Sequence, residues 1–87
     1  MDYRIHFHEG AIKDLKKLDF PVRKSIVEKI ESHLIQAPLN LGKPLKGNFK
    51  GLYRYRIGDY RVIYMIDIIE EIIFVTNVNH RKKFTNN

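Results

Sequence analysis

The sequence predicts an α+β fold with the element order β-α-α-β-β-β, in which a two-helix hairpin packs on one face of an antiparallel four-stranded sheet. Apolar residues recur at helical spacing between residues 9 and 37, whereas later segments follow the two-residue period of strands. Short turn signals separate those later segments. The 87 residues contain no linker or repeat, so we expect a single domain over residues 1–87.

The first strand is predicted over Tyr3–Phe7, where aromatic and β-branched residues occur in alternation. From Glu9 the pattern changes to helical spacing. The apolar stripe of this first helix consists of Ala11, Leu15 and Leu18. Asp19-Phe20-Pro21 interrupts the helix, because proline favours the first turn of a new helix.

The second helix has a longer apolar stripe than the first. Its members recur four residues apart and are Val22, Ile26, Ile30 and Leu34. Ala37-Pro38 ends this helix. Each helix is therefore amphipathic, and together they predict a hairpin laid against another layer.

That layer is a predicted sheet, which follows a loop over residues 38–51 that is rich in glycine, proline and lysine. Leu52–Ile57 and Tyr60–Asp67 are expected strands, joined by a tight turn at Gly58-Asp59. Glu71–Asn79 is the last strand of this meander, and the N-terminal strand is expected to join it at an edge.

The middle strand is apolar on both faces, from Tyr60 to Ile66. One face should pack against the helices. The other face either binds a ligand or partner on a concave surface, or belongs to a central strand half-covered by loops. The sequence leaves both interpretations open.

The net charge of +6 is concentrated in one quarter of the chain. Residues 41–61 contain six Lys and Arg residues against the single acid Asp59, whereas the acids and bases nearly balance elsewhere. A cationic surface of this kind favours a polyanionic partner such as a nucleic acid or an acidic protein segment. The clustering makes this interpretation stronger than a basic composition kept only for solubility.

Four arginines are expected to converge on the sheet face that the helices leave open. Strand alternation separates Arg54 and Arg56 from the tyrosines between them, Arg61 begins the neighbouring strand, and Arg81 follows the last one. The planar guanidinium group can hold two phosphate oxygens, so an anion site is predicted. The alternative is cross-strand pairing with Asp59 and Asp67, but two acids are too few for four arginines.

Other charged residues supplement this prediction. His80 is the candidate proton carrier because it stands beside Arg81 at a strand end, although most single histidines have no catalytic role. Lys46 and Lys50 are expected to steer phosphates, whereas Lys43 is better explained as a solvated charge. No function is assigned to the other three histidines, which are His6, His8 and His33.

Several classes of site are not expected. The absence of cysteine excludes disulfides, thiolate metal sites and a cysteine nucleophile. We find no metal-binding motif, and we expect no metal or other cofactor. No apolar run is long enough to span a membrane, and the first residues do not resemble a secretion signal, so a cytoplasmic location is expected.

The segment from Pro44 to Tyr64, PLKGNFKGLYRYRIGDYRVIY, followed later by His80-Arg81, resembles the RelE/ParE superfamily of bacterial toxins from type II toxin–antitoxin systems. The resemblance covers nearly the whole chain and includes the helical hairpin that ends at a proline. It implies a RelE-like fold, a four-stranded sheet with two packed helices. The motif is more specific for the superfamily than for any one activity within it.

For a RelE-like member, the resemblance implies a metal-independent endoribonuclease that cuts messenger RNA in the ribosome and leaves a 2′,3′-cyclic phosphate. Arg61, Arg81, Arg56 and His80 match or adjoin the catalytic positions, and we expect Arg54, Lys46, Lys50 and Phe84 to bind RNA. Phe84-Thr85 stands where family members often have a tyrosine, so the hydroxyl that would orient the base or activate the ribose is missing. Phe84 can stack on a base but cannot exchange a proton.

The alternative function is that of a ParE-like, non-enzymatic inhibitor of DNA gyrase. The arginines favour the nuclease, whereas the missing tyrosine favours the inhibitor. Both hypotheses imply a cognate antitoxin as partner, and the first adds the ribosome and its message.

Overall fold

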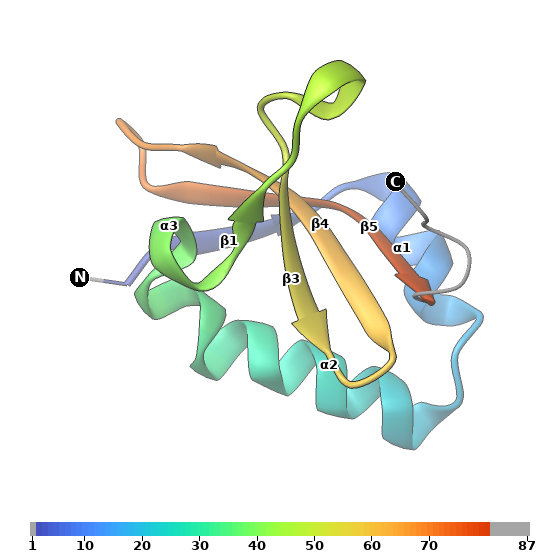
Figure 1. Cartoon of the computed structure of the whole chain (residues 1–87). Helices are drawn as coiled ribbons and strands as arrows, with labels where there is room; N and C mark the ends of the chain where they lie inside the picture. Colours follow the sequence, from blue (N-terminus) through green and yellow to red (C-terminus); the bar gives the residue numbers. More distant parts are fainter. Residues whose placement is uncertain (1, 81–87) are drawn as a thin grey trace.

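The computed structural model describes residues 2–80 as a sheet with helices packed against it (Figure 1). The helices and strands are β1 (Arg4–Phe7), α1 (Glu9–Lys16), α2 (Phe20–Ser32), η1 (Leu34–Gln36), α3 (Pro38–Leu41), β2 (Lys43–Pro44), η2 (Gly47–Phe49), β3 (Tyr53–Ile57), β4 (Tyr60–Asp67) and β5 (Ile72–His80). This is the predicted α+β fold with its two main helices and meander. No described helix has both the length and the apolar composition needed to cross a bilayer.

The sheet has five strands in the order β1-β5-β4-β3-β2, one more than predicted. The additional strand is β2, because Lys43 and Pro44 pair with Arg54 and Tyr53 inside the segment that was expected to be a loop. That segment also contains α3 and η2. The sequence pattern missed them because each element is only two to four residues long.

The sheet is mixed rather than wholly antiparallel. The meander β3-β4-β5 is antiparallel as predicted, but β1 pairs with β5 in parallel, with Arg4 beside Ile72 and Phe7 beside Val75. Parallel neighbours need a long connection, and α1 and α2 lie in the connection that follows β1. The edge position predicted for this strand is confirmed.

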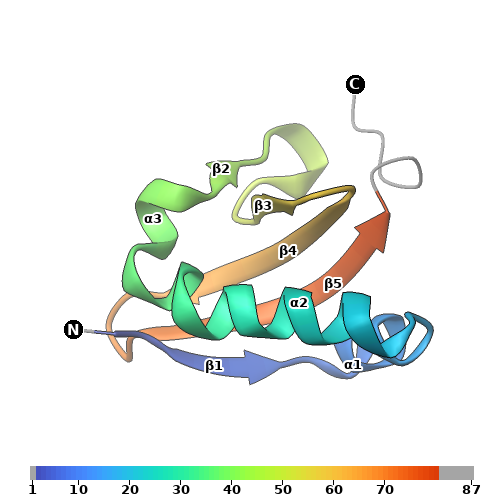
Figure 2. The same cartoon turned by 90° about the horizontal axis from the view of Figure 1, so that it is seen from below.

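Helix α2 lies across one face of the sheet (Figure 2). The predicted stripes form the core: Ala11, Ile26, Ile30 and Leu34 are buried and contact the sheet's apolar face. The buried sheet residues of this core are Tyr55, Val62, Tyr64, Ile73, Val75 and Val78. Helix α1 is tied to β5 because the Asp14 carboxylate accepts a hydrogen bond from the Val78 backbone N–H at 2.9 Å.

The β3–β4 hairpin turns at Gly58, as predicted. This residue has φ of 58°, a conformation that costs glycine little, and glycine is favoured at the first central position of one common two-residue hairpin turn. The turn sets the register that places Arg56 opposite Arg61.

Candidate nucleic-acid interface

Four cationic side chains share the sheet face opposite the helices. Tyr55 belongs to the helix-packed core, so strand alternation places Arg54 and Arg56 on the other face. Directly opposite residues of antiparallel strands lie on one face, and the register pairs Arg56 with Arg61 and Arg54 with Lys43. We call this set, Lys43, Arg54, Arg56 and Arg61, the cationic face.

The cationic face surrounds a cavity of about 240 Å³, which we call the cationic cavity. Its lining residues are Leu41, Lys43, Arg54, Tyr55, Arg56 and Arg61. Arg54 and Arg61 are half-buried, whereas Lys43 and Arg56 are exposed. Arg56 is oriented by a hydrogen bond from its Nε to the Gly58 carbonyl at 3.1 Å. Three of the four predicted arginines therefore meet at one cavity.

The two cross-strand pairs on this face are both pairs of like charge, a pattern that destabilises a sheet. None of the described residues that line the cavity is acidic. Asp67, one of the two acids considered for neutralisation, lies at the other end of β4 and accepts a hydrogen bond from the Glu70 backbone N–H at 2.9 Å. Asp59 lies in the hairpin turn beside the pair formed by Arg56 and Arg61. A bound polyanion would offset the repulsion between the four cations.

His80 lies on the other face of the sheet. Arg61 is in register with Asn79, and Tyr60 with His80, so alternation directs the histidine to the helix side. Its ring contacts the Tyr60 ring edge-on at 5.3 Å and lines a separate cavity with Asp14 and Lys17. The expected grouping of His80 with the arginines is therefore not observed.

The remaining predicted site residues are Lys46, Lys50 and Phe84, which were expected to bind RNA, and Arg81, which was expected to be catalytic. Lys46 is exposed and lines a second cavity that also includes Lys43 and Arg54. Lys50 is exposed and lines a third cavity with Gly51 and Leu52, and Lys46 lines this cavity as well. Arg81 and Phe84 lie outside the described residues.

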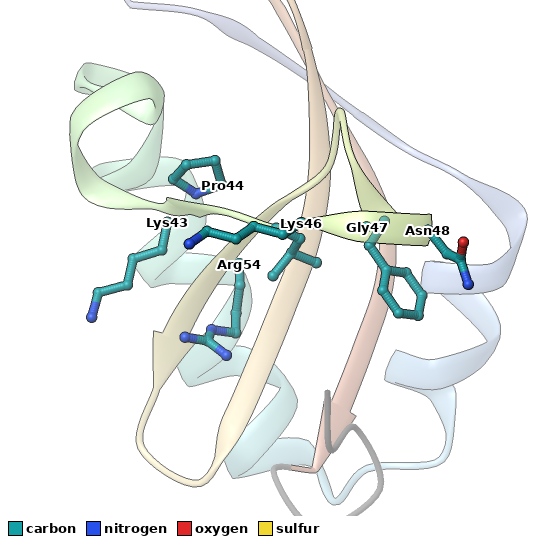
Figure 3. A pocket seen from close by; sticks show the side chains of 8 residues that line it. Lys43, Pro44, Lys46, Gly47, Asn48 and Arg54 are labelled. Atoms are coloured by element: carbon teal, nitrogen blue, oxygen red, sulfur yellow. The ribbon is translucent and has the colours of Figure 1, made fainter. Parts of the chain in front are cut away.

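The second cavity has a volume of about 540 Å³, and we call it the loop cavity (Figure 3). It lies between β2, the following loop and Arg54, and its lining residues are Lys43, Pro44, Leu45, Lys46, Gly47, Asn48, Phe49 and Arg54. Lys43, Lys46 and Arg54 gather at one end, and Asn48 lies at the other. Lys43 and Arg54 line both cavities, so the two adjoin.

Sequence reasoning missed Lys43 as a residue of the cationic face, and Asn48 and Phe49 as residues of the loop cavity. Lys43 was better explained as a solvated charge because nothing in the pattern predicted β2, whose register brings it opposite Arg54. The one available signal for Phe49 was an aromatic residue between two lysines in a polar loop.

The apolar open face of β4 is covered at one position and exposed at another. Ile63 is buried although it lies on that face, whereas Met65 is 46% exposed. The interpretation of a strand half-covered by loops fits Ile63, and that of an open apolar surface fits Met65. Met65 lines a shallow cavity with Ile68 and Phe74.

The three histidines without an assigned function make local structural contacts. His8 caps α1 by accepting a hydrogen bond from the Gly10 backbone N–H at 3.2 Å. His33 lies 2.6 Å from the Tyr55 hydroxyl, joining the end of α2 to β3. His6 packs edge-on against Phe74.

Comparisons with known proteins agree with this architecture. The family model described as the ParE toxin of the type II toxin–antitoxin system parDE matches residues 5–83. Toxin RelG of Mycobacterium tuberculosis is 35% identical over 81 residues, which cover 93% of each chain.

Two solved structures have the same fold. The toxin–antitoxin complex RelBE2 of M. tuberculosis contains a chain that matches with a TM-score of 0.89 and 33% identity, over 93% of this chain and 100% of that one. A chain of the archaeal RelE–RelB complex of Pyrococcus horikoshii matches with a TM-score of 0.72 and 27% identity, over 97% of this chain and 100% of that one.

Proposed function

This chain belongs to the RelE/ParE toxins of type II toxin–antitoxin systems, and we propose that it acts as a ribosome-dependent endoribonuclease on messenger RNA. The observation that carries the proposal is the cationic cavity. Its cations form two cross-strand pairs of like charge, Arg54 with Lys43 and Arg56 with Arg61. An RNA backbone supplies phosphates at the spacing of successive nucleotides, and would neutralise several of these cations at once. On a ribosomal target the protein would act in the cytoplasm.

In the proposed reaction, the ribose 2′-hydroxyl attacks the adjacent phosphorus. The new O2′–P bond forms as the P–O5′ bond breaks, which leaves a 2′,3′-cyclic phosphate and a 5′-hydroxyl. Arg61 would stabilise the charge that develops on the phosphoryl oxygens, while Arg54 and Arg56 hold the backbone. The resemblance assigns Arg81 to the same task as Arg61.

The reaction also moves one proton, which leaves the attacking 2′-hydroxyl and is taken up by the departing 5′-oxygen. The cationic cavity favours the ionised form of the attacking hydroxyl, because neighbouring positive charge stabilises an anion. His80 was the expected carrier, but it lies on the opposite face from Arg61. We therefore propose that electrostatic stabilisation, rather than a histidine on this face, supplies most of the rate enhancement.

The ParE-like alternative, inhibition of DNA gyrase without catalysis, gains support from the same observation. Among the described residues, neither a histidine nor a carboxylate lines the cationic cavity. A docking function needs no proton carrier, and a cationic face could also bind an acidic protein surface.

We further propose a cognate antitoxin as partner, as in the RelBE2 and archaeal RelE–RelB complexes. Acidic residues of such a partner would neutralise the cationic face and keep nucleic acid away from it.

The direct test is to add purified protein to programmed ribosomes and to map any cuts in the message. We expect cleavage with a 2′,3′-cyclic end, and a reduction of about 10²–10³-fold in Arg61→Ala, the loss typical of one electrostatic donor. Lys24→Ala, an exposed residue of α2, is the matched control and should cut normally. If the message stayed intact while the protein inhibited DNA supercoiling by gyrase, the gyrase alternative would be established instead.

A further inference from the structure

The loop cavity combines two features that proteins use to bind single-stranded nucleic acid. Lys43, Lys46 and Arg54 supply positive charge, and Phe49, whose side chain is 40% exposed, supplies an aromatic ring. Cationic grooves track the phosphate backbone, while aromatic rings stack on bases. An exposed phenylalanine alone would be unremarkable, but here it shares one cavity with three cations.

The size and the polar lining suit a nucleotide base. A volume of about 540 Å³ falls within the ~300–1,000 Å³ of small-molecule sites. Asn48 lies at the end away from the cations, and its amide can donate to or accept from the edge of a base. By contrast, the cavity beside Met65 and Phe74 has an aromatic ring and the acid Asp67 but no cation.

The position of the loop cavity relates it to the proposed reaction. Lys43 and Arg54 form the wall between it and the cationic cavity. A phosphate held by Lys43 and Arg54 would therefore join one nucleotide in the cationic cavity to a neighbouring nucleotide in the loop cavity. One phosphodiester would then lie among the arginines while the neighbouring base entered the loop cavity.

We propose that the loop cavity binds an unpaired RNA base next to the phosphate held in the cationic cavity, by stacking on Phe49 with Asn48 at the base edge. This inference rests on the proposed function, because it takes the substrate to be RNA. It assigns Phe49 and Asn48 to substrate binding, which neither the sequence pattern nor the arginine cluster predicts.

The test uses the isolated protein and a short single-stranded RNA in which one adenine is replaced by the fluorescent base 2-aminopurine. We expect fluorescence quenching on binding, as the probe stacks. Phe49→Leu, which keeps apolar volume but removes the ring, should lose the quenching and weaken binding about tenfold, within the range for one base–aromatic stack. Phe49→Tyr should retain both, and Phe20→Leu, a 62% exposed aromatic on α2, is the matched control.

Three results would overturn the inference: equal quenching in Phe49→Leu and the original protein, equal binding of the RNA and an abasic version, or no binding of the RNA at all. A thermal unfolding midpoint unchanged in Phe49→Leu ensures that a loss reflects the ring rather than the fold. Failure of the proposed function is a separate result, because ribosomal message could stay intact while Phe49 still quenched the probe.

Discussion

At the scale of single residues, Tyr64 joins the core to the segment that carries Lys43. Its side chain is fully buried, and its hydroxyl donates a hydrogen bond to the Pro38 carbonyl at 2.7 Å. Its ring stacks on that of Tyr53, with centroids 5.5 Å apart. Burial, with smaller contributions from Tyr53 and Tyr55, raises the pKa of Tyr64 well above its ordinary value. This tyrosine therefore fixes α3 to the sheet only while it is protonated.

We predict that replacing Tyr64 by phenylalanine changes how stability depends on pH. Near pH 7 the variant should be about 1 kcal/mol less stable, because the buried Pro38 carbonyl loses its donor. Above the pKa of an unfolded tyrosine, about 10, the unfolded chain loses a proton that the folded chain retains, so stability falls as pH rises. The original protein should then lose its advantage over the variant. Urea unfolding between about pH 7 and 11 measures the difference in free energy of unfolding between the two proteins. A difference that stays constant over this range would contradict the argument.

At the scale of elements, the short segment from α3 to β2 decides where Lys43 points. Gly42 lies between these elements with φ of −94°, which any residue can adopt, so space rather than conformation requires glycine here. A Cβ at this position would overlap the Tyr64 hydroxyl and ring. The close approach of this backbone to the buried ring brings β2 alongside β3.

We predict that Gly42→Ala destabilises the protein by about 1–3 kcal/mol, the usual cost of overpacking, and lowers Tm by at least about 4 °C. Cleavage should also fall, since Lys43 follows directly. Asn40→Ala, an exposed change in α3, should leave both properties unchanged. Calorimetry of Gly42→Ala in the Tyr64→Phe background provides the second check. The double variant should lose less stability than the sum of the two single changes, because removing the hydroxyl makes room for the new methyl group.

The elements also show what the sequence could and could not predict. Of the long periodic segments, β4 has the expected bounds, Tyr60–Asp67. The second helix was predicted too long: α2 ends at Ser32 rather than at Ala37, so Leu34, the last residue of the expected stripe, lies in η1. Alternation along β3 correctly placed Arg54 and Arg56 on one face, because a two-residue period determines the face. Pairing between distant segments has no such local signal, so the parallel partner of β1 was missed.

The same lack of a local signal for distant pairing explains which residues of the candidate site could be predicted from the sequence and which could not. Arg61 was predicted beside Arg56 because a two-residue turn fixes its register. Lys43 reaches the site only through β2, a two-residue strand positioned by packing around Gly42 and Tyr64. His80 does lie at a strand end, as expected, but the sequence could not give its face, which depends on its register with Tyr60 and is offset from the rest of the ladder by a bulge between Ile63 and Tyr64.

At the scale of the whole molecule, the uneven charge produces a face that should bind single strands with a marked dependence on salt. Each phosphate neutralised on a single strand contributes about −0.7 to the slope of log K against log salt concentration. If the four cations of the cationic face each contact one phosphate, the slope should be about −3.

Removing one of these cations, in Lys43→Gln or Arg56→Gln, should make the slope shallower by about 0.7, while binding weakens most at low salt. Lys24→Gln removes the same charge from the exposed surface of α2, so it lowers the net charge equally but takes no cation from the cationic face. Titration of a short RNA over several salt concentrations separates the two cases. If Lys24→Gln changed the slope as much as Lys43→Gln, binding would follow total charge, and the cross-strand arrangement of the four cations would have no role in it.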